Sequence, residues 1–297
     1  MKKYFLLAAI IYVVAGCQES LPPVNMELVK GLVYDTTMRV PFSQLPPADN
    51  QVLLIEDVTG VRCTGCPNAA QIAADIKENS TAGSVVIVGV YPNTPKSLTT
   101  YISPYEDLFY ETRLTSELSQ LIAQNMYMVG GTLPGGGLNR KILDGKINVD
   151  YNTWVNYANT LKNVKSIVNL ETNLRFINDS TAELKSRALF VGDAVSIPYV
   201  TIFLIEDNIK YPQYFVDSTS YSYKHKHVLR EAYTPYNGLP LLTNGFTSAE
   251  RGVAIDQEWN LVIPKYVVQE NASIVIMINY NDGANQEVIQ CREIKLK

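Results

Sequence analysis

Two cysteines separated by two residues, Cys63 and Cys66, stand between an apolar segment and an amphipathic one. The apolar segment, residues 51–58, is bounded by turn residues and has the length of a buried strand. Residues 67–77 begin with a proline, which the first turn of a helix tolerates, and their apolar residues recur with a helical period. Residues 84–91 form a second apolar segment of strand length. This order predicts two parallel strands joined by a helix, with the cysteines at the start of that helix.

The helical pattern returns twice in the following hundred residues. Thr115 or Ser116 can cap a helix over residues 117–127, whose leucines and isoleucine share one face. The Asp-Gly pair at residues 144–145 predicts a tight hairpin turn. Asp150 can then cap a last helix that runs to about residue 162. We therefore expect residues 28–164 to form an α/β domain.

Beyond Val164 the apolar period becomes that of strands, and residues 165–297 are expected to form a second, all-β domain. A run of strands without helical segments between them favours a β-sandwich of the immunoglobulin-like kind. Residues 207–252 interrupt this run with a long Tyr- and Pro-containing connection, which is either functional or partly disordered. Residues 92–110, rich in Pro, Thr, Ser and Tyr, are expected to be an irregular insertion or lid. The strands are expected at residues 167–177, 181–191, 199–206, 253–263, 273–280 and 287–296.

The N-terminus has the pattern of a secretory signal, with Lys2 and Lys3 before an apolar run over residues 5–14. That run is too short to span a membrane. It ends in Val-Ala-Gly before Cys17 and resembles the lipobox, where bacteria attach lipid to the cysteine and cleave before it. An ordinary signal peptide beside an unrelated cysteine is the alternative. On the lipobox interpretation, residues 1–16 are a signal peptide and residues 17–27 are a lipid-anchored tether.

The charge balance and the hydropathy indicate which partners the chain can bind. With 25 basic and 29 acidic residues the formal net charge is −4, so the chain lacks the basic surface that nucleic acid binding requires. No second apolar stretch approaches membrane-spanning length, so we expect the lipid on Cys17 to hold the protein to the membrane. Export places the cysteines in a compartment that permits disulfides. We expect no cofactor.

The spacing of Cys63 and Cys66 suits both a zinc site and a redox pair. Zinc needs two more ligands, and the only histidines are His225 and His227, far downstream, so a mixed site across the two domains is the alternative to redox chemistry. At a helix N-terminus the dipole and free amides favour the thiolate of Cys63, the expected nucleophile. Cys66, one helical turn on, can resolve a mixed disulfide. Arg62 either faces the sulfur and favours the thiolate further or points into water.

Three other features have simple structural interpretations. His225 and His227 alternate with lysines, a pattern that is more typical of a solvated strand or loop than of a metal site. The three glycines at 135–137 lack the Lys-Ser/Thr and the helix that a phosphate loop requires. Cys291 lies in an alternating strand and is expected to be a small buried hydrophobe.

The order strand, Cys63-Thr64-Gly65-Cys66-Pro67, helix, strand, helix, Leu133-Pro134, hairpin, helix is similar to that of the thioredoxin superfamily. The resemblance implies that Pro134 is a cis-proline beside the cysteines, and that Leu133 hydrogen-bonds the substrate chain. It also implies a buried acid before the motif. Asp57 matches that place and would relay a proton toward Cys66, although Glu56 could be the inward residue instead. Arg62 replaces the usual aromatic residue, which leaves the redox potential open.

Four short segments stand in order along the chain: Thr59-Gly60-x-x-Cys63-x-x-Cys66-Pro67, residues 134–140, His227-Val228-Leu229-Arg230 and Glu287-Val288-Ile289-Gln290. Through them almost the whole chain resembles the family of 28-kDa outer-membrane-protein-like lipoproteins, which join a thioredoxin-like domain to a C-terminal sandwich. Gln18, which follows Cys17, is not the aspartate that can retain lipoproteins in the inner membrane, so we expect the outer membrane, on either its periplasmic or its surface face.

Two functions are compatible with the sequence. The first is thiol-disulfide exchange, or redox-dependent binding, on exported proteins that carry thiols or disulfides, with Arg62 and Leu133 contacting the substrate. The second is a surface or periplasmic binding or adhesion module, in which the cysteine pair is only a structural disulfide. The long loop and the 19 tyrosines motivate the second, because tyrosine offers contact area at low entropic cost.

Overall fold

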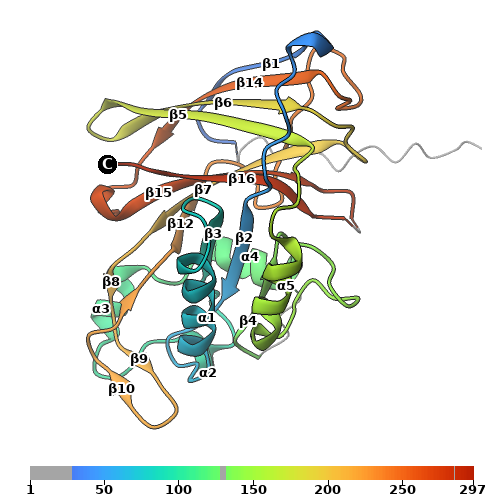
Figure 1. The fold of residues 1–297 in the computed structure, drawn as a ribbon. Coiled ribbons are helices and arrows are strands. Elements are labelled where there is room, and N and C mark those ends of the chain that lie inside the picture. The colour runs from blue at the N-terminus through green and yellow to red at the C-terminus, as the bar shows by residue number, and fades with distance from the viewer. Residues whose placement is uncertain (1–28, 128–131, 284) are drawn as a thin grey trace, which may run out of the picture.

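The computed structural model describes residues 29–127, 132–283 and 285–297. A four-stranded sheet packs on one part of an eight-stranded sheet, and helices cover another part of that larger sheet (Figure 1). This confirms the prediction of an α/β part followed by a β-sandwich. Within the described residues, no helix is long and apolar enough to cross a membrane.

The N-terminal half contributes three neighbouring strands of the eight-stranded sheet. β2 and β3 pair in parallel, and β4 pairs antiparallel with the other side of β2. Helices α1 and α5 cover one face of these strands, and α4 packs on the opposite face. Ser116 caps α4 by accepting a hydrogen bond from the Ser119 amide, as predicted. The elements are β2 (Leu53–Val58), α1 (Cys66–Glu78), β3 (Val85–Val90), α2 (Lys96–Thr99), α3 (Glu106–Thr112), α4 (Glu117–Asn125), β4 (Gly135–Leu138), a 3₁₀ turn (Tyr151–Thr153) and α5 (Trp154–Leu161).

The six long strands of the C-terminal half lie where the apolar pattern predicts them, within a residue or two at each end. β5 and β6 alternate between buried and exposed residues because only one face of their sheet is covered. Every residue of β7 and β15 is buried, since these strands are covered on both faces. The strands are β5 (Val168–Asn178), β6 (Thr181–Phe190), β7 (Pro198–Glu206), β14 (Val253–Val262), β15 (Ala272–Tyr280) and β16 (Val288–Lys295).

Two strands connect the halves in ways the sequence pattern did not indicate. β1 (Leu32–Arg39) lies in the segment expected to belong to the N-terminal domain, yet it pairs with β14 of the sandwich. β12 (Val228–Ala232), from the long connection, pairs with β7 on one side and with β3 on the other. The sheet therefore runs without a break in the order β16-β15-β7-β12-β3-β2-β4, with β13 (Leu239–Pro240) paired to β7.

The connection over residues 207–252 is ordered. It contains two small antiparallel ladders that project below the sandwich beside α1 (Figure 1). Because the predicted loop forms short strands, its backbone groups find partners, and it can hold fixed side chains near the cysteines. The ladders are β8 (Ile209–Lys210) with β11 (Lys224–His225), and β9 (Gln213–Tyr214) with β10 (Thr219–Ser220).

The large sheet curls so that β16 approaches the start of β2. The amide of Val52 donates to Gln290 Oε1 at 2.9 Å, and the amide of Val288 donates to the carbonyl of Asn139 at 2.8 Å. An apolar core fills the inside of the curl, with Cys291 at 0% exposure among its residues. Cys291 is therefore the buried hydrophobe that its strand pattern predicts.

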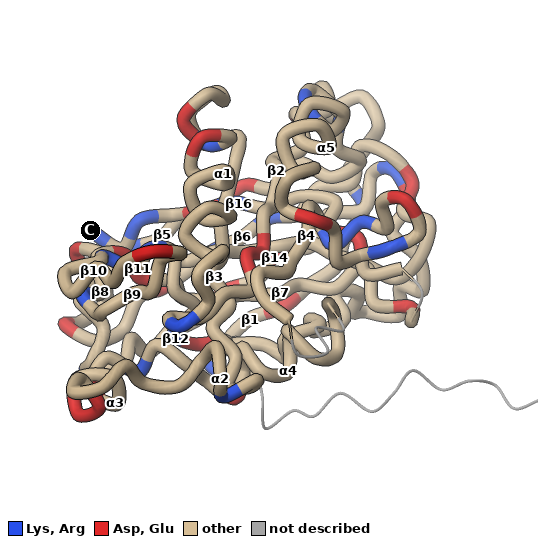
Figure 2. Tube along the Cα trace, turned by 90° about the horizontal axis from the view of Figure 1, so that it is seen from below, with Lys and Arg blue, Asp and Glu red and all other residues tan. Residues whose placement is uncertain are grey.

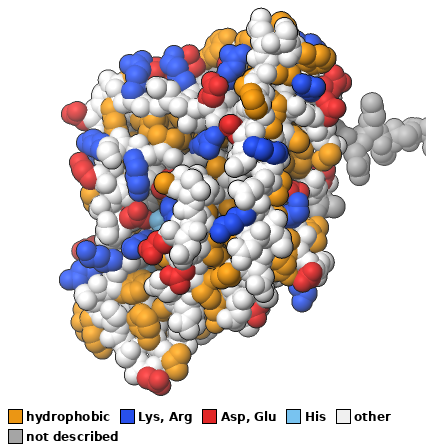
Figure 3. Space-filling model, in the orientation of Figure 1, with side chains coloured by type: hydrophobic (Ala, Val, Ile, Leu, Met, Phe, Trp, Pro, Cys, Tyr) orange, Lys and Arg blue, Asp and Glu red, His pale blue; other side chains and the backbone are white. Residues whose placement is uncertain are grey.

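Charge is spread evenly over the molecule. Lys and Arg lie among Asp and Glu around the fold (Figure 2), and charged side chains of both signs mix with hydrophobic ones on the face shown in Figure 3. Most of the ion pairs join exposed or half-exposed side chains. Such pairs contribute little to stability, so packing and the continuous sheet carry the fold.

Candidate functional site

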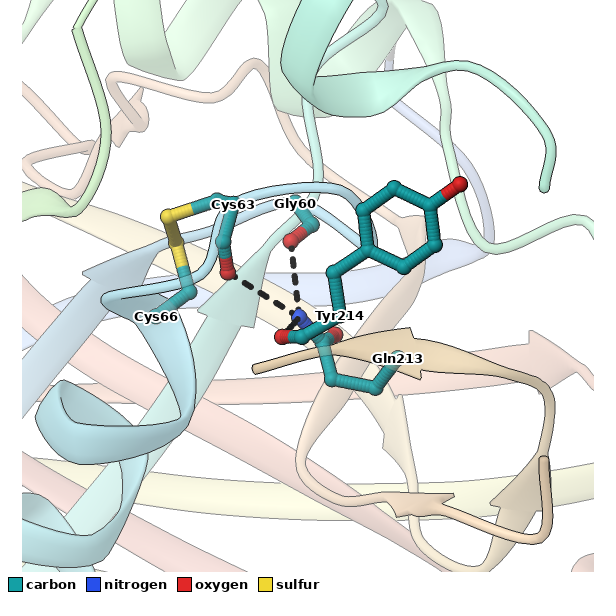
Figure 4. Close-up of a disulfide and its surroundings, with 5 residues drawn as sticks. All are labelled: Gly60, Cys63, Cys66, Gln213 and Tyr214. Atoms are coloured by element: carbon teal, nitrogen blue, oxygen red, sulfur yellow. Dashed lines mark hydrogen bonds between the residues drawn. A yellow bond between two sulfur atoms is a disulfide. The ribbon is translucent and has the colours of Figure 1, made fainter. Parts of the chain in front are cut away.

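Cys63 and Cys66 form a disulfide with an S–S distance of 2.09 Å, at the point where the chain passes from β2 into α1 (Figure 4). Cys66 is the first residue of α1, and Cys63 lies in the preceding turn. Cys63 is 2% exposed and Cys66 is 1% exposed. The pair therefore stands at a helix N-terminus, as predicted, but is nearly closed off from solvent.

A side chain from the C-terminal half contacts the segment over residues 60–66, which we call the cysteine turn. Gln213 in β9 points its amide group at three carbonyl oxygens: Nε2 lies 3.3 Å from Gly60 O, 3.1 Å from Cys63 O and 3.0 Å from Tyr214 O (Figure 4). The backbone amide of Tyr214 adds a bond of 2.9 Å to Val61 O. Two consecutive residues of β9 thus hold the segment that carries Cys63.

Arg62 packs on an aromatic ring. Its guanidinium carbon lies 5.8 Å from the ring centroid of Tyr214, within the range of a cation–π contact. Its backbone amide donates to Leu98 O at the end of α2 at 2.9 Å. Of the two orientations considered from the sequence, toward the sulfur or into water, neither describes this packing against the C-terminal segment.

Leu133 and Pro134 lie against the two ends of the cysteine turn. The peptide bond between them is cis. A Cβ atom placed on Gly65 would stand 3.4 Å from Pro134 Cδ, and one placed on Gly60 would stand 3.0 Å from Leu133 Cδ1. The structure therefore brings Pro134 beside Gly65, one of the two residues that separate the cysteines.

Asp57, and not Glu56, faces the helix that carries the cysteines. The face of β2 that holds Leu53 and Ile55 packs on α1 and α5, and the alternation of a strand places Asp57 on it. Asp57 is 4% exposed, and its Oδ1 atom has no hydrogen-bond partner among the described residues. Burial raises the pKa of its carboxyl group to about 7.

Asp57 lines a cavity of about 350 Å³ between α1 and the C-terminal connection. Pro67 forms part of one wall, and Phe215 and Tyr223 form part of the opposite wall. The negative charge of an ionised Asp57 contributes to raising the pKa of the Tyr223 hydroxyl, after burial. A buried acid beside a cavity large enough to hold water can exchange its proton through that water.

Glu56 has a structural role on the opposite face. Its carboxylate accepts two hydrogen bonds of 2.8 Å from Arg140 and one from the Tyr127 hydroxyl. The side chains of Glu56 and Arg140 are both 0% exposed. Such a fully buried pair persists only because each charge compensates the other. Arg140 belongs to the segment that carried the family resemblance, but its partner was not predicted.

The two histidines lie in different surroundings. His225 is 1% exposed and not solvated as its pattern suggested; its Nδ1 lies 3.0 Å from the Tyr91 hydroxyl, and burial lowers its pKa to about 4. The backbone amide of His227 donates to Asp207 at 2.7 Å. Among the residues that the structure describes, no three potential ligands gather into a metal site.

The sequence did not indicate Gln213, Tyr214 or Tyr223 as part of this site. They lie about 150 residues beyond the cysteines in a segment with no strong period, and the only signal was its unusual tyrosine content. Their placement depends on β12 joining the sheet beside β3, which fixes where the connection runs.

Comparison with known proteins gives a family and a fold. The model of the family described as outer membrane protein Omp28 matches residues 122–297, more than half of the chain. HBP35 of Porphyromonas gingivalis superposes with a TM-score of 0.59 at 13% identity, over 84% of this chain and 76% of that one. A domain of the outer membrane lipoprotein Omp28 from the same organism gives a TM-score of 0.30 at 17% identity, over 44% and 88%. No curated protein sequence matches the chain.

Proposed function

Given that the chain belongs to the Omp28 family of outer membrane proteins, we propose that it performs thiol-disulfide exchange on exported proteins. The predicted outer-membrane location is confirmed by this family. We further propose that the N-terminal half is thioredoxin-like, that the sandwich is immunoglobulin-like, and that residues 28–164 and 165–297 act as its two functional parts. Lipid on Cys17 would hold the protein at the membrane.

The observation that carries the proposal is the disulfide between Cys63 and Cys66 at the start of α1, with Pro134 on one side and Asp57 on the same face of the sheet. The helix dipole favours a thiolate at this place. A nearby acid with a pKa of about 7 can accept or return a proton near neutral pH. These are the groups that exchange needs.

In the reducing direction, the thiolate of Cys63 attacks one sulfur of a substrate disulfide and displaces the other as a thiolate. A mixed disulfide joins Cys63 to the substrate. Cys66 then gives its proton to Asp57 and attacks the sulfur of Cys63, which releases the second substrate thiolate. The substrate disulfide gains two electrons, and the protein dithiol becomes the disulfide. The oxidising direction reverses each step.

Serine substitutions test this sequence of steps. Cys63→Ser removes the attacking thiolate and is expected to abolish insulin reduction. Cys66→Ser keeps the attack but removes the resolving thiol, so mixed disulfides with substrate are expected to accumulate on non-reducing gels. Cys291→Ser, a buried cysteine outside the site, is the matched control and should behave as wild type. Equal insulin reduction in all four proteins would disprove the proposal.

The burial of both cysteines favours a second candidate, a binding module in which the disulfide is a structural link. The reduction potential separates the two. Exchange predicts a value within the range of exchange catalysts, roughly −120 to −270 mV, when soluble protein lacking residues 1–17 is equilibrated with glutathione buffers. A value below about −300 mV would instead mark a structural disulfide.

A further inference from the structure

The contact between Gln213 and the cysteine turn joins two parts of the chain that are 150 residues apart. Gln213 is 2% exposed, so its amide group has little access to water. Its two N–H bonds face the carbonyl oxygens of Gly60, Cys63 and Tyr214. A buried carbonyl that loses its donor is costly, so these bonds hold the cysteine turn and β9 together.

The same contact acts on the backbone of Cys63 (Figure 4). The carbonyl of Cys63 accepts both from Gln213 at 3.1 Å and from the Cys66 amide at 3.3 Å. The hydrogen bonds of Gln213, called the clamp below, therefore act on the residue that carries the attacking sulfur. The bond from the Tyr214 amide to Val61 O and the packing of Arg62 on Tyr214 extend the contact along the turn. While the cysteine pair stays buried, an attacking thiol cannot approach either sulfur along the axis of the S–S bond.

We propose that Gln213 is a positioning residue for the exchange reaction: it holds the cysteine turn closed against β9, and the disulfide exchanges only when this contact opens. The inference rests on the proposed function for its biological meaning. It makes the C-terminal half a part of the redox site, because the group that controls access to Cys63 comes from the connection between β7 and β12.

The experiment is the reduction of the native disulfide by dithiothreitol, followed by trapping of the protein thiols. The two thiols of one dithiothreitol molecule attack in turn, through a mixed disulfide with the protein. They give two electrons to the protein disulfide and become the cyclic disulfide, so the reaction balances without a protein substrate. Gln213→Met keeps the size of the side chain and removes the donor. Gln269→Met makes the same change at the exposed bond to Asp179 O and is the control.

Gln213→Met is expected to be reduced at least about fivefold faster than wild type, the effect of losing one ordinary hydrogen bond from the closed state. Gln269→Met should match wild type. In 8 M urea the clamp is absent from every protein, so all should be reduced at one rate. Gly83→Ala, which strains an open turn away from the cysteines, shows whether lower global stability alone speeds reduction.

A native rate for Gln213→Met less than about fivefold above wild type, or an equal increase in Gly83→Ala, overturns the proposal. If Gln213→Met fails to fold, Gln213→Asn replaces it, because the shorter side chain withdraws its donor from the carbonyls while it stays polar. Failure of the proposed function looks different: faster reduction of Gln213→Met together with no insulin reduction by wild type would support the clamp and disprove exchange on protein substrates.

Discussion

Asp57 and Glu56 are adjacent acids with opposite surroundings. Arg140 compensates the charge of Glu56, whereas burial dominates at Asp57 and holds the pKa of its carboxyl group near 7. Asp57 is therefore a group whose ionisation the folded state opposes. A proton relay near neutral pH needs such a group. Ionising the group in the folded protein lowers the free energy of unfolding.

The pH dependence of stability tests this. The pKa of Asp57 is about 3.9 in the unfolded chain and about 7 in the folded one, so between these values the folded state binds more protons. The contribution of Asp57 to the free energy of unfolding is fully present below pH 4 and is lost as the pH rises through 7. Asp57→Asn is expected to be more stable than wild type at pH 8, by up to about 4 kcal/mol, and similar at pH 4.5.

Urea unfolding at the two pH values measures the difference. Asp217→Asn, an exposed aspartate in the turn between β9 and β10, is the control and should change stability equally little at both. If the gain of Asp57→Asn is the same at pH 4.5 and pH 8, the carboxyl group of Asp57 does not carry a raised pKa.

The residue-scale predictions from sequence were limited by distance along the chain. Strand alternation places Asp57 and Glu56 on opposite faces, but which face meets the cysteines depends on how α1 packs, so both stayed open. The place of Pro134 beside the cysteines followed from a resemblance of motif order. The contact of Arg62 with Tyr214 had no local signal, because no apolar period fixed the position of Tyr214.

At the scale of elements, the glycines of β4 explain how β2 is held on the side away from β3. Gly136 pairs with Asp57 at a φ of 131°, and a Cβ atom there would stand 2.0 Å from the Glu56 carbonyl oxygen. A Cβ atom on Gly137 would stand 2.4 Å from the carbonyl oxygen of Ile147. The glycine run thus permits close backbone approach.

Gly136→Ala is expected to lower the free energy of unfolding by more than about 3 kcal/mol, because the added atom meets fixed backbone and the φ is one that alanine rarely adopts. Gly83→Ala also places alanine at positive φ, 76°, but meets nothing within 4 Å. It is expected to cost only about 1–2 kcal/mol. Equal losses for the two variants in urea unfolding would contradict the close approach of β4 to β2.

Elements with a strong period were predicted, and elements placed by partners were not. α1, α4 and the six long strands carry their own apolar pattern, which fixes type and extent. β12 is five residues long within a Tyr- and Pro-containing connection, and β1 carries too weak a pattern to indicate a strand. Both are strands because neighbouring strands offer them unpaired edges.

At the scale of the whole molecule, one sheet crosses the boundary expected near residue 164. The two tryptophans report on the two halves: Trp154, the first residue of α5, lies in the core between the helices and β2, and Trp259, in β14, lies in the core of the sandwich. Each is 0% exposed. Because β12 is hydrogen-bonded to strands of both halves, neither core can lose its strands without disturbing the other.

Trp154→Phe and Trp259→Phe each leave one tryptophan, which reports on one half by its fluorescence. Within each variant, the urea midpoint measured by fluorescence is therefore expected to equal the midpoint measured by circular dichroism, which follows the whole molecule. Coincident transitions are the sign of a two-state process. Fluorescence and dichroism that separate within either variant would show that the halves unfold independently despite the shared sheet.

The position of β12 also has a consequence for how the chain is made. Chains begin to fold from the N-terminus during synthesis, and 137 residues separate the end of β3 at Val90 from the start of β12 at Val228. Until β12 pairs with it, β3 has one edge whose backbone N–H and C=O groups are unpaired. Exposed apolar edges of this kind promote aggregation. A chain that has emerged only as far as its first two thirds therefore exposes this edge of β3 until residues 228–232 can pair with it.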